Sequence, residues 1–383
     1  MNEYLELKDF GPIKALNLEI KPLMVFIGES GSGKSAILKL MSLIRWVHKQ
    51  NNLHTFFEKE FELREEYFQE LLANSEILEF FNEKTQFNFT IDGAKYQYKE
   101  QKFIFDKVEK QKITFDKIAF LSESRILLPN VLGRQLNYNA IFPFFLEDTL
   151  YNFDKAREKL KKGNEFKLSS TEQYLKQNSE NQFFVKGNNF EIRLENASSG
   201  TKTAFSLELI VDYFTQKYDY KEILDNALRR FRFGTFSTGI DIHRPKNLSI
   251  FVEEPELSLF PSAQRRLINR LIKDCFVENR HINCTTRLAF ATHSPYILAS
   301  LNNLLLAGEL ASLKPERKGD IDEVVSDRYW LTMKQIGVYF IQDGILKSAM
   351  DEEEKMIDGN FLDAISEEIS EEFSKLLDIQ YEN

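Results

Sequence analysis

The stretch Gly28-Glu29-Ser30-Gly31-Ser32-Gly33-Lys34-Ser35 decides the fold of this chain. It matches the spacing G-x-x-x-x-G-K-[ST], in which a glycine-rich loop wraps a phosphate and a lysine reaches it. The apolar run 23–27 before it is typical of a buried strand, and residues 35–41 after it have apolar positions at helical spacing. A loop between a strand and a helix directs several N–H groups at one point, where the helix dipole adds positive potential. The stretch therefore predicts a nucleotide site rather than a chance glycine-serine turn.

Each position of this loop has an expected part in the site. Gly28, Gly31 and Gly33 let the backbone approach a phosphate closely. Lys34 is expected to reach the β- and γ-phosphates, and the Ser35 hydroxyl to bind Mg²⁺. Contacts to the nucleotide are therefore expected from Gly28, Ser30, Gly31, Ser32, Gly33, Lys34, Ser35 and Ala36.

The composition limits the classes of protein to consider. Of the 383 residues, 43% are hydrophobic and 28% charged, as in globular chains of roughly two domains. The formal net charge of −9 provides no overall attraction to nucleic acid or to an anionic membrane. Cys275 and Cys284 lack metal-site spacing and are expected to be reduced, structural thiols. Because we find neither a signal-peptide pattern nor an apolar run of membrane-spanning length, we expect a cytoplasmic protein outside the membrane.

Two acidic residues, Glu253 and Glu254, follow a second apolar strand at residues 248–252. Sites of parallel α/β sheets lie at the carboxyl ends of the strands, so both residues are expected beside the phosphate loop. Glu253 is expected to hold Mg²⁺ through water, and Glu254 to orient or deprotonate the attacking water. For Glu256, a solvated acidic turn is the simpler interpretation.

Two further stretches have the chemistry of phosphate contacts. His293 follows a third apolar strand at 288–291 and is expected to contact the γ-phosphate rather than to be a capping or surface histidine. Ser198, Ser199 and Gly200 precede a predicted helix, and hydroxyls at a helix start form a good anion site. Since the chain already has one phosphate loop, this second anion site indicates a composite site shared between two chains.

The remaining pattern predicts an α/β fold. Alternating residues around Gly11-Pro12 predict a hairpin, and residues 86–121 predict several antiparallel strands. Residues 163–182 are polar and are expected to be mobile, whereas 183–194 predict a second hairpin. Phe361, Leu362, Ile365, Ile369, Phe373 and Leu376 would lie on one face of an acidic C-terminal helix.

The order of these motifs resembles that of the ABC-type ATPase heads, within the SMC/RecF/OLD-like branch of P-loop ATPases (the AAA_15/AAA_21 type). The segment Leu7 to Ile13 resembles the hairpin that precedes the phosphate loop there. Glu253-Glu254-Pro255-Glu256 and Ala291-Thr292-His293-Ser294-Pro295 resemble the "EEPE" and "THSP" segments of the OLD-like group, and Phe120 to Arg125 resembles another of its segments.

The resemblance implies a fold and an assembly. It implies one ABC-type head over residues 1–383, with a mixed central sheet, nucleotide-binding lobes at 1–49 and 183–383, and an inserted helical and antiparallel β region at 50–182. It further implies a head-to-tail dimer that binds ATP and Mg²⁺ between copies. Lys34, Glu254 and His293 would act on one side, and Ser198, Ser199, Gly200 and Lys202 of the second copy would close the site.

The chain also departs from that family. The signature is Ser-Ser-Gly-Thr-Lys rather than the transporter Leu-Ser-Gly-Gly-Gln, and Glu253 replaces an aspartate. Either Glu123 or Arg125 stands where a glutamine usually senses the γ-phosphate. No TOPRIM nuclease is apparent, since Asp320-Ile321-Asp322 lies in a predicted polar loop.

Three functions remain open at this point. The resemblance favours an ATP-driven switch that controls a separately encoded effector, a nuclease or toxin, in anti-phage defence. One alternative is a DNA-repair or recombination ATPase that binds DNA through Arg229, Arg230, Arg232 or Arg265, Arg266, Arg270, although solvated helix faces explain these groups more simply. The other alternative is an ATP-binding scaffold with little turnover.

Overall fold

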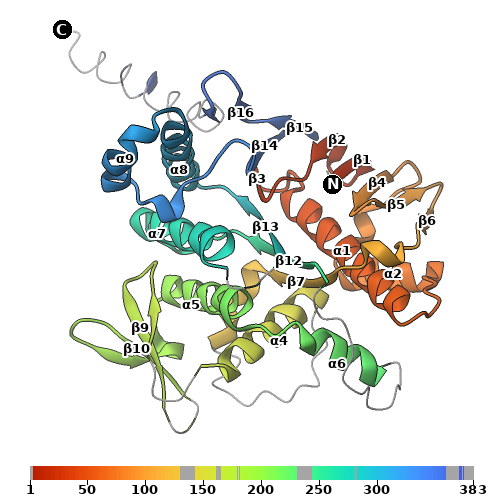
Figure 1. Cartoon of the computed structure of the whole chain (residues 1–383), viewed down its shortest axis with the longest axis horizontal. Coiled ribbons are helices and arrows are strands. Elements are labelled where there is room, and N and C mark those ends of the chain that lie inside the picture. The colour runs from red at the N-terminus through yellow and green to blue at the C-terminus, as the bar shows by residue number, and fades with distance from the viewer. Residues whose placement is uncertain are drawn as a thin grey trace.

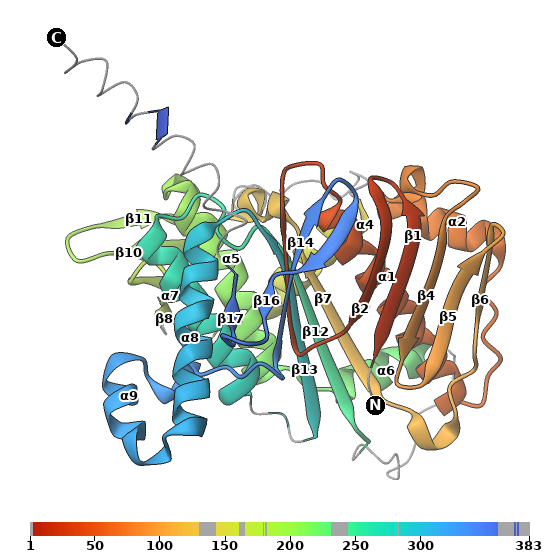
Figure 2. The same cartoon turned by 90° about the horizontal axis from the view of Figure 1, so that it is seen from above.

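The computed structural model describes residues 3–129, 143–160, 165–178, 180, 182–230, 244–279, 281, 283–358, 371, 372 and 374. Its largest feature is an 11-stranded mixed sheet with helices packed on both faces (Figures 1 and 2). Its strands are β1 (Tyr4–Phe10), β2 (Ile13–Glu19), β3 (Leu23–Gly28), β4 (Gln86–Ile91), β5 (Ala94–Lys99), β6 (Lys102–Phe105), β7 (Phe115–Leu121), β12 (Lys246–Glu253), β13 (Cys284–Thr292), β14 (Ile336–Gln342) and β15 (Ile345–Ser348).

The strands run in the order β6-β5-β4-β1-β2-β15-β14-β3-β13-β12-β7. The last five, β14, β3, β13, β12 and β7, are parallel to one another and form the parallel core. The strands β2, β1, β4, β5 and β6 pair antiparallel and form the antiparallel arm. The hairpin β14–β15 joins the two parts, because β15 also pairs with β2.

Eight helices are described outside the sheet: α1 (Lys34–Phe56), α2 (Glu65–Asn74), α4 (Phe144–Glu158), α5 (Ser199–Asp212), α6 (Lys221–Arg230), α7 (Pro261–Ile272), α8 (Pro295–Leu313) and α9 (Lys318–Val324). A separate four-stranded sheet contains β8 (Glu165–Leu168), β9 (Gln173–Gln177), β10 (Phe183–Lys186) and β11 (Glu191–Arg193). A small ribbon pairs β16 (Met350–Asp351) with β17 (Met356–Ile357).

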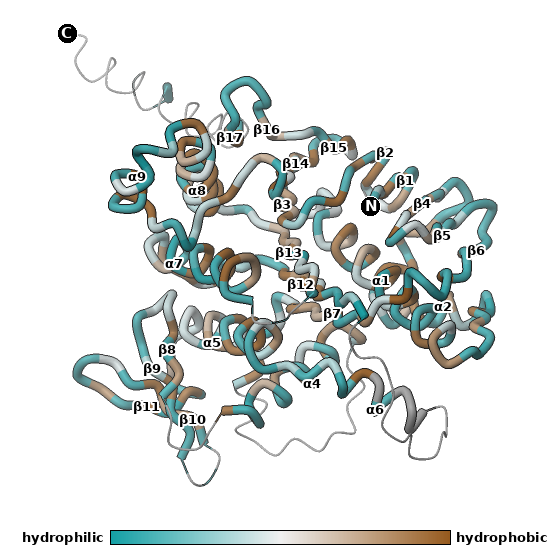
Figure 3. The backbone as a smooth tube through the Cα atoms, viewed as in Figure 1, coloured by the Kyte–Doolittle hydropathy of each residue, from teal (hydrophilic) through white to brown (hydrophobic). Residues whose placement is uncertain are grey.

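The parallel core separates two apolar layers, because side chains of a strand point alternately to its two faces. From β3, Leu23, Val25 and Ile27 join the layer that contains α5, α7 and α8. Met24 and Phe26 join the opposite layer, which contains α1. The brown hydrophobic segments of Figure 3 accordingly gather along the central strands and the helix faces that cover them. The helix that follows the phosphate loop and the helix that follows Ser198 therefore lie on opposite faces of one sheet.

Most sequence-based elements are confirmed, including the hairpins β1–β2 and β10–β11. Two predictions were wrong. Residues 118–121 belong to β7, which pairs in parallel with β12 rather than within an antiparallel group. The polar stretch 163–182 contains the strands β8 and β9, which pair with each other.

Two further expectations need correction or fall outside the described chain. Asp320 and Asp322 lie on the helix α9 rather than in a loop, and Asp320 pairs with Arg317 at 2.7 Å. The predicted C-terminal helix, with Phe361, Leu362, Ile365, Ile369, Phe373 and Leu376, lies outside the described residues.

One helix of the described chain, α8, is long and apolar enough to cross a membrane by length and composition alone. The expectation that no apolar run reaches membrane-spanning length is therefore wrong. Half of its most apolar window is buried in the fold, where Leu301 and Leu305 belong to the layer shared with α5 and α7.

Candidate functional site

The phosphate loop lies at the carboxyl end of β3, between β14 and β13 in the middle of the parallel core. The backbone of Gly28 has φ +149° and that of Gly33 has φ +100°, where a residue with a Cβ is strained. A Cβ at Gly28 would lie 2.6 Å from the Ile341 carbonyl oxygen. The glycines are thus required by the path of the loop, as the sequence predicts.

Lys34 is buried and directed into this loop. Its Nζ donates to the carbonyl oxygens of Gly28 and Glu29, both at 2.7 Å. Burial lowers the pKa of Lys34 to about 8, although the charges of Glu254, Glu256 and Glu29 oppose this shift. The first turn of α1 has no side-chain cap, so its N–H groups face the same loop. An ammonium and a helix start that converge on one loop form a site for phosphate.

Glu253, the last residue of β12, lies next to Ser35. Its side chain is 4% exposed, and its Oε2 accepts the Glu123 N–H at 3.2 Å. Burial raises the pKa of Glu253, whereas the charge of Lys39 and the hydrogen bonds from the Glu123 N–H and the Ser35 hydroxyl oppose the rise. A carboxylate beside a hydroxyl offers the oxygen ligands that Mg²⁺ prefers, so these residues fit that ion.

Glu254 and His293 approach one another across the ends of β12 and β13. The Glu254 Oε1 lies 3.8 Å from the His293 Nε2, and both side chains are about one-third exposed. Burial raises the pKa of Glu254, as do the charges of Glu256 and Glu123, while His293 and Arg125 oppose the rise. Glu254 has φ +43°, an unfavourable conformation for a residue other than glycine. A carboxylate with a raised pKa on a strained backbone is typical of a catalytic base.

Arg125 holds the backbone of both acidic residues in place. Its guanidinium is fully buried and donates to the carbonyl oxygen of Glu253 at 2.6 Å and to that of Glu254. Burial lowers the pKa of Arg125 to about 10, against the charges of Glu256, Glu253, Glu254 and Glu123. The sequence offered Arg125 only as a candidate γ-phosphate sensor. The sequence could have indicated this role, because Arg125 lies two residues after Glu123 and just beyond the end of β7. That position places Arg125 at the same edge of the sheet as Glu253 and Glu254.

Glu256 is a second positioning residue, and its interpretation as a solvated turn was wrong. Its Oε1 accepts the Thr292 hydroxyl at 2.9 Å and the His293 N–H at 2.7 Å. These bonds tie the loop after β12 to the end of β13, and therefore fix Glu254 relative to His293.

The signature residues begin α5 on the other face of the sheet. Ser198 caps the helix by accepting the Thr201 N–H at 3.2 Å, and both Ser198 and Ser199 are exposed. A Cβ at Gly200 would lie 2.5 Å from the Ser258 carbonyl oxygen, so only glycine packs here against the loop after Glu254. Lys202 follows one residue after Thr201 and is half-buried. The structure brings Lys34, Ser35, Glu253, Glu254 and His293 together at one edge of the sheet. The signature begins α5, which lies on the face of the sheet opposite to α1.

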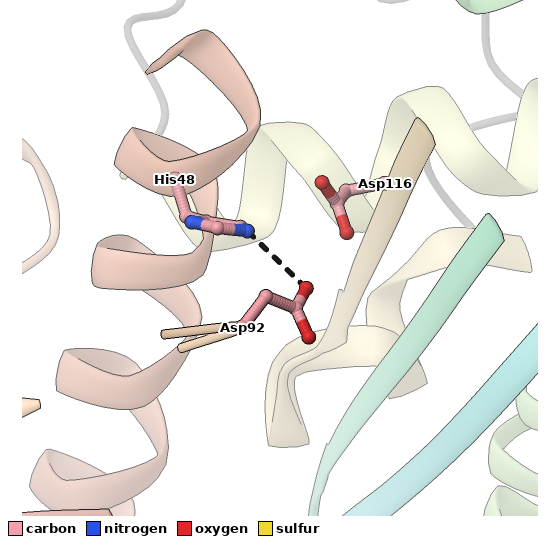
Figure 4. A group of neighbouring side chains, drawn as sticks. All are labelled: His48, Asp92 and Asp116. Carbon is pink, nitrogen blue, oxygen red and sulfur yellow. Dashed lines mark ion pairs between the residues drawn. The ribbon is translucent and has the colours of Figure 1, made fainter. Parts of the chain in front are cut away.

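A second polar cluster lies at the amino end of the same strands. His48 on α1, Asp92 in the β4–β5 turn and Asp116 on β7 offer ligand atoms within 4.8 Å of one another (Figure 4). The Asp116 carboxylate accepts from the side chains of Asn52, Thr114 and Asn247. We define these residues, with Glu3, Arg45 and Arg287, as the amino-edge network.

The charges of the amino-edge network favour a structural role over a metal centre. Burial alone would raise the pKa of Asp92, but His48, Arg287 and Arg45 outweigh it and lower the pKa to about 2. Glu3 accepts from both guanidiniums, from Arg287 at 2.7 Å and from Arg45. A metal cation here would add positive charge beside two buried arginines. The contacts therefore join the antiparallel arm to the parallel core.

The arginines considered for nucleic acid are partly accounted for within the chain. Arg270 pairs with Asp212 at 3.3 Å and with Asp274, and the Arg266 Nε donates to the Ser170 carbonyl oxygen at 2.9 Å. Arg265 is exposed. The side chains of Arg229 and Arg230, and the whole of Arg232, lie outside the described residues. The two thiols are free; burial raises the pKa of Cys275, as a structural thiol requires.

Comparison with known families agrees with this geometry. Residues 137–298, which include the signature, Glu253, Glu254 and His293, match the family model described as AAA ATPase domain (AAA_15). This part of the chain is therefore similar to a family of ATPase domains. Residues 1–123, which include the phosphate loop, match a family described as a protein of unknown function (DUF2813).

Solved structures resemble this chain only loosely. An SMC head domain from Thermotoga maritima is 12% identical, with 92% of this chain and 99% of that chain covered and a TM-score of 0.40. An SMC head bound to the C-winged helix domain of ScpA is 13% identical, covering 93% and 99%, with a TM-score of 0.39. A dimeric ATP-binding cassette, MJ0796, bound to ADP and Pi is 12% identical, covering 90% and 98%, with a TM-score of 0.32. Similarity this loose supports no functional conclusion, and a search of curated proteins finds no match.

Proposed function

We propose that this chain binds and hydrolyses ATP between two copies of itself that meet head to tail. The observation that carries the proposal is the placement of its two anion-binding helix starts on opposite faces of the parallel core. In one copy, Lys34 and the start of α1 lie on one face of the sheet. The exposed Ser198 and Ser199 of the same copy lie at the start of α5, on the other face. Two copies related by a two-fold axis would each supply the half that the other lacks.

The residues at the carboxyl edge divide the chemistry among them. Lys34 and the first N–H groups of α1 bind the phosphates and stabilise the charge that develops on them. Mg²⁺, when bound by Ser35 and Glu253, supplies neutralisation of phosphate charge. Glu254 accepts the proton of the attacking water, and its raised pKa makes its carboxylate a stronger base. His293 contacts the γ-phosphate, while Arg125 and Glu256 hold the two catalytic segments in register.

Ser199, Gly200 and Lys202 of the second copy would complete the site around the γ-phosphate. Because they bind only when ATP is present, ATP favours the closed dimer and hydrolysis opens it. Ser198 is committed to capping α5, so its contribution is the orientation of the helix start.

The nucleotide dependence of the assembly tests this proposal. Glu254→Gln keeps the shape of the side chain but removes the base, so ATP should hold this variant as a dimer in light scattering. Wild-type protein should return to the smaller species as ATP is consumed. The control Lys34→Ala should remain at the smaller size with ATP. Equal sizes of Glu254→Gln with and without ATP would contradict the proposal.

We further propose that the dimer is a cytoplasmic switch for a separately encoded effector in anti-phage defence. Support comes from the resemblance to the OLD-like group, and from Asp320 and Asp322 lying on a short helix rather than at strand ends, where a TOPRIM nuclease has its acids. A plating assay with the neighbouring genes present tests the role: Glu254→Gln should abolish protection from phage. Unchanged protection would instead favour a scaffold with little turnover.

A further inference from the structure

A cavity of about 180 Å³ lies beside the edge strand β7, at the opposite end of α1 from the phosphate loop. Its walls come from α1, β7, α4, α6 and the turn after α5. From Lys34 to Lys49, α1 rises roughly 20 Å at 1.5 Å per residue, so the cavity is separate from the ATP site. A water molecule occupies about 30 Å³ in the liquid, so the space accommodates a small organic molecule.

The charged groups of this cavity are mainly positive. Lys49, Lys117 and Lys155 line it, whereas Glu222 is its one lining carboxylate among the described residues. Lys117 is more than nine-tenths buried, and its Nζ donates to the Asn152 Oδ1 at 2.9 Å. Among the described residues no carboxylate lies within ion-pair distance of Lys117, although the negative charges of Asp148 and Glu222 act on it from further away. An ammonium has three donors, so Lys117 retains capacity to bind an anion.

Aromatic rings form the wall around Lys117. The ammonium lies 4.7 Å from the centroid of Phe214 and 6.0 Å from that of Tyr218. Tyr213 also lines the cavity, and its buried hydroxyl has no hydrogen-bond partner among the described residues. A buried hydroxyl without a partner is unfavourable, and a bound ligand that reaches it would relieve that cost.

The backbone around this wall is unusual. Tyr213 and Phe214 belong to a π-helical turn, Tyr213–Lys217, that follows α5 directly. Single π-helical turns are rare and are frequently found at functional sites.

We propose that this cavity binds a small anion that carries a planar ring, and that its occupancy regulates the ATP site. The anionic group would pair with Lys117, and the ring would pack against Tyr213, Phe214 and Tyr218.

Three elements connect the cavity to the ATP site. The helix α1 begins at Lys34 and reaches the cavity with Lys49. The helix α5 begins at the signature and ends at Tyr213. The strand β7 contains Lys117 and leads to Arg125, which holds Glu253 and Glu254. The regulatory half of the proposal rests on the proposed function, whereas the binding half does not.

Binding is tested by calorimetry in the Lys34→Ala background, which removes phosphate-loop binding. The probes are AMP and 4-hydroxybenzoate, two ring-bearing anions; inorganic phosphate and adenosine each lack one half of that chemistry. We expect at least one ring-bearing anion to bind more tightly than phosphate or adenosine. Adding Lys117→Met to this background should weaken binding of the ring-bearing anion about tenfold or more, since a buried charged hydrogen bond is lost. The control Lys186→Met removes a surface charge and should leave binding unchanged.

Tyr213→Phe separates binding from folding. Because the hydroxyl has no partner in the described chain, its removal should leave the melting temperature unchanged or higher while weakening the ring-bearing anion several-fold. A lower melting temperature with unchanged affinity would overturn the site. So would the absence of binding by both ring-bearing probes.

Regulation is tested by ATP hydrolysis in the otherwise wild-type protein. The bound probe should change the rate at least twofold, and Lys117→Met should abolish the response. An unchanged rate at saturating probe would overturn the regulatory half. If the wild type hydrolyses no ATP, the proposed function fails, but calorimetry still decides whether the cavity is a binding site.

Discussion

The two ends of the parallel core contain buried polar groups of opposite character. At the carboxyl edge, Glu254 has a strained backbone and a raised pKa, and its carboxylate is about one-third exposed. At the amino edge, Asp92 and Asp116 are hydrogen-bonded, and His48, Arg287 and Arg45 lower the pKa of Asp92 to about 2. Both edges thus have carboxylates. The surroundings of Glu254 disfavour its charged form, whereas those of Asp92 favour it. Raised pKa and strain indicate a reaction, whereas satisfied charges indicate stabilisation.

The largest expected effect is the loss of turnover at the carboxyl edge. Glu254→Gln should lower the ATP hydrolysis rate by about 10²–10⁴-fold, because it removes a general base. The melting temperature should not fall, since the carboxylate is destabilised in the folded protein. A matched control is Glu256→Gln, whose amide oxygen can still accept from Thr292 and His293 and which should retain most activity. Equal loss in both variants would show that the two acids share one role.

At the amino edge, the expected effect is on stability. Glu3→Gln leaves the guanidiniums of Arg45 and Arg287 without their shared carboxylate and should cost about 3–5 kcal/mol of unfolding free energy. The control Glu6→Gln changes an exposed residue of β1 and should stay within about 0.5 kcal/mol. Urea unfolding measures both. A Glu3→Gln variant as stable as Glu6→Gln would remove the distinction between the two edges.

A smaller, pH-dependent effect is expected at Asp92. Its pKa is lowered from 3.8 to about 2 on folding, so its ionised form contributes stability above pH 4 that is lost as the pH falls through 2. Asp92→Asn should therefore cost about 2 kcal/mol at neutral pH. The difference from wild type should shrink between pH 4 and pH 2, which unfolding curves across that range measure. A difference independent of pH would mean that packing, rather than charge, holds this turn.

The sequence predicts the carboxyl edge well because its signals are local. The phosphate loop, the acids after 248–252 and His293 each directly follow an apolar strand, and parallel strands bring such residues to one edge. The backbone conformation of the phosphate loop at Gly28 and the hairpins can likewise be predicted from residues that are close in the sequence.

What the sequence did not predict depends on distant partners. The parallel pairing of β7 with β12, the bonds from Arg125 to Glu253 and Glu254, and those from Thr292 and His293 to Glu256 join residues far apart in the chain. The amino-edge network draws on Glu3, α1, the β4–β5 turn, β7, β12 and β13, and no local pattern marks it. The strands β8 and β9 were missed because their polar composition resembles that of a loop.

The central claim is that each ATP site is divided between two copies. It is tested most directly by mixing two inactive variants, Lys34→Ala and Ser199→Arg. The second variant places a bulky cation at an exposed signature position without the clash that a side chain at Gly200 would cause. In a mixed dimer, one site has an intact phosphate loop from one copy and an intact signature from the other. Equal amounts should therefore recover about a quarter of wild-type hydrolysis through random pairing. No recovery, from variants that each fold and associate normally, would show that the site is complete within one chain and would contradict the account.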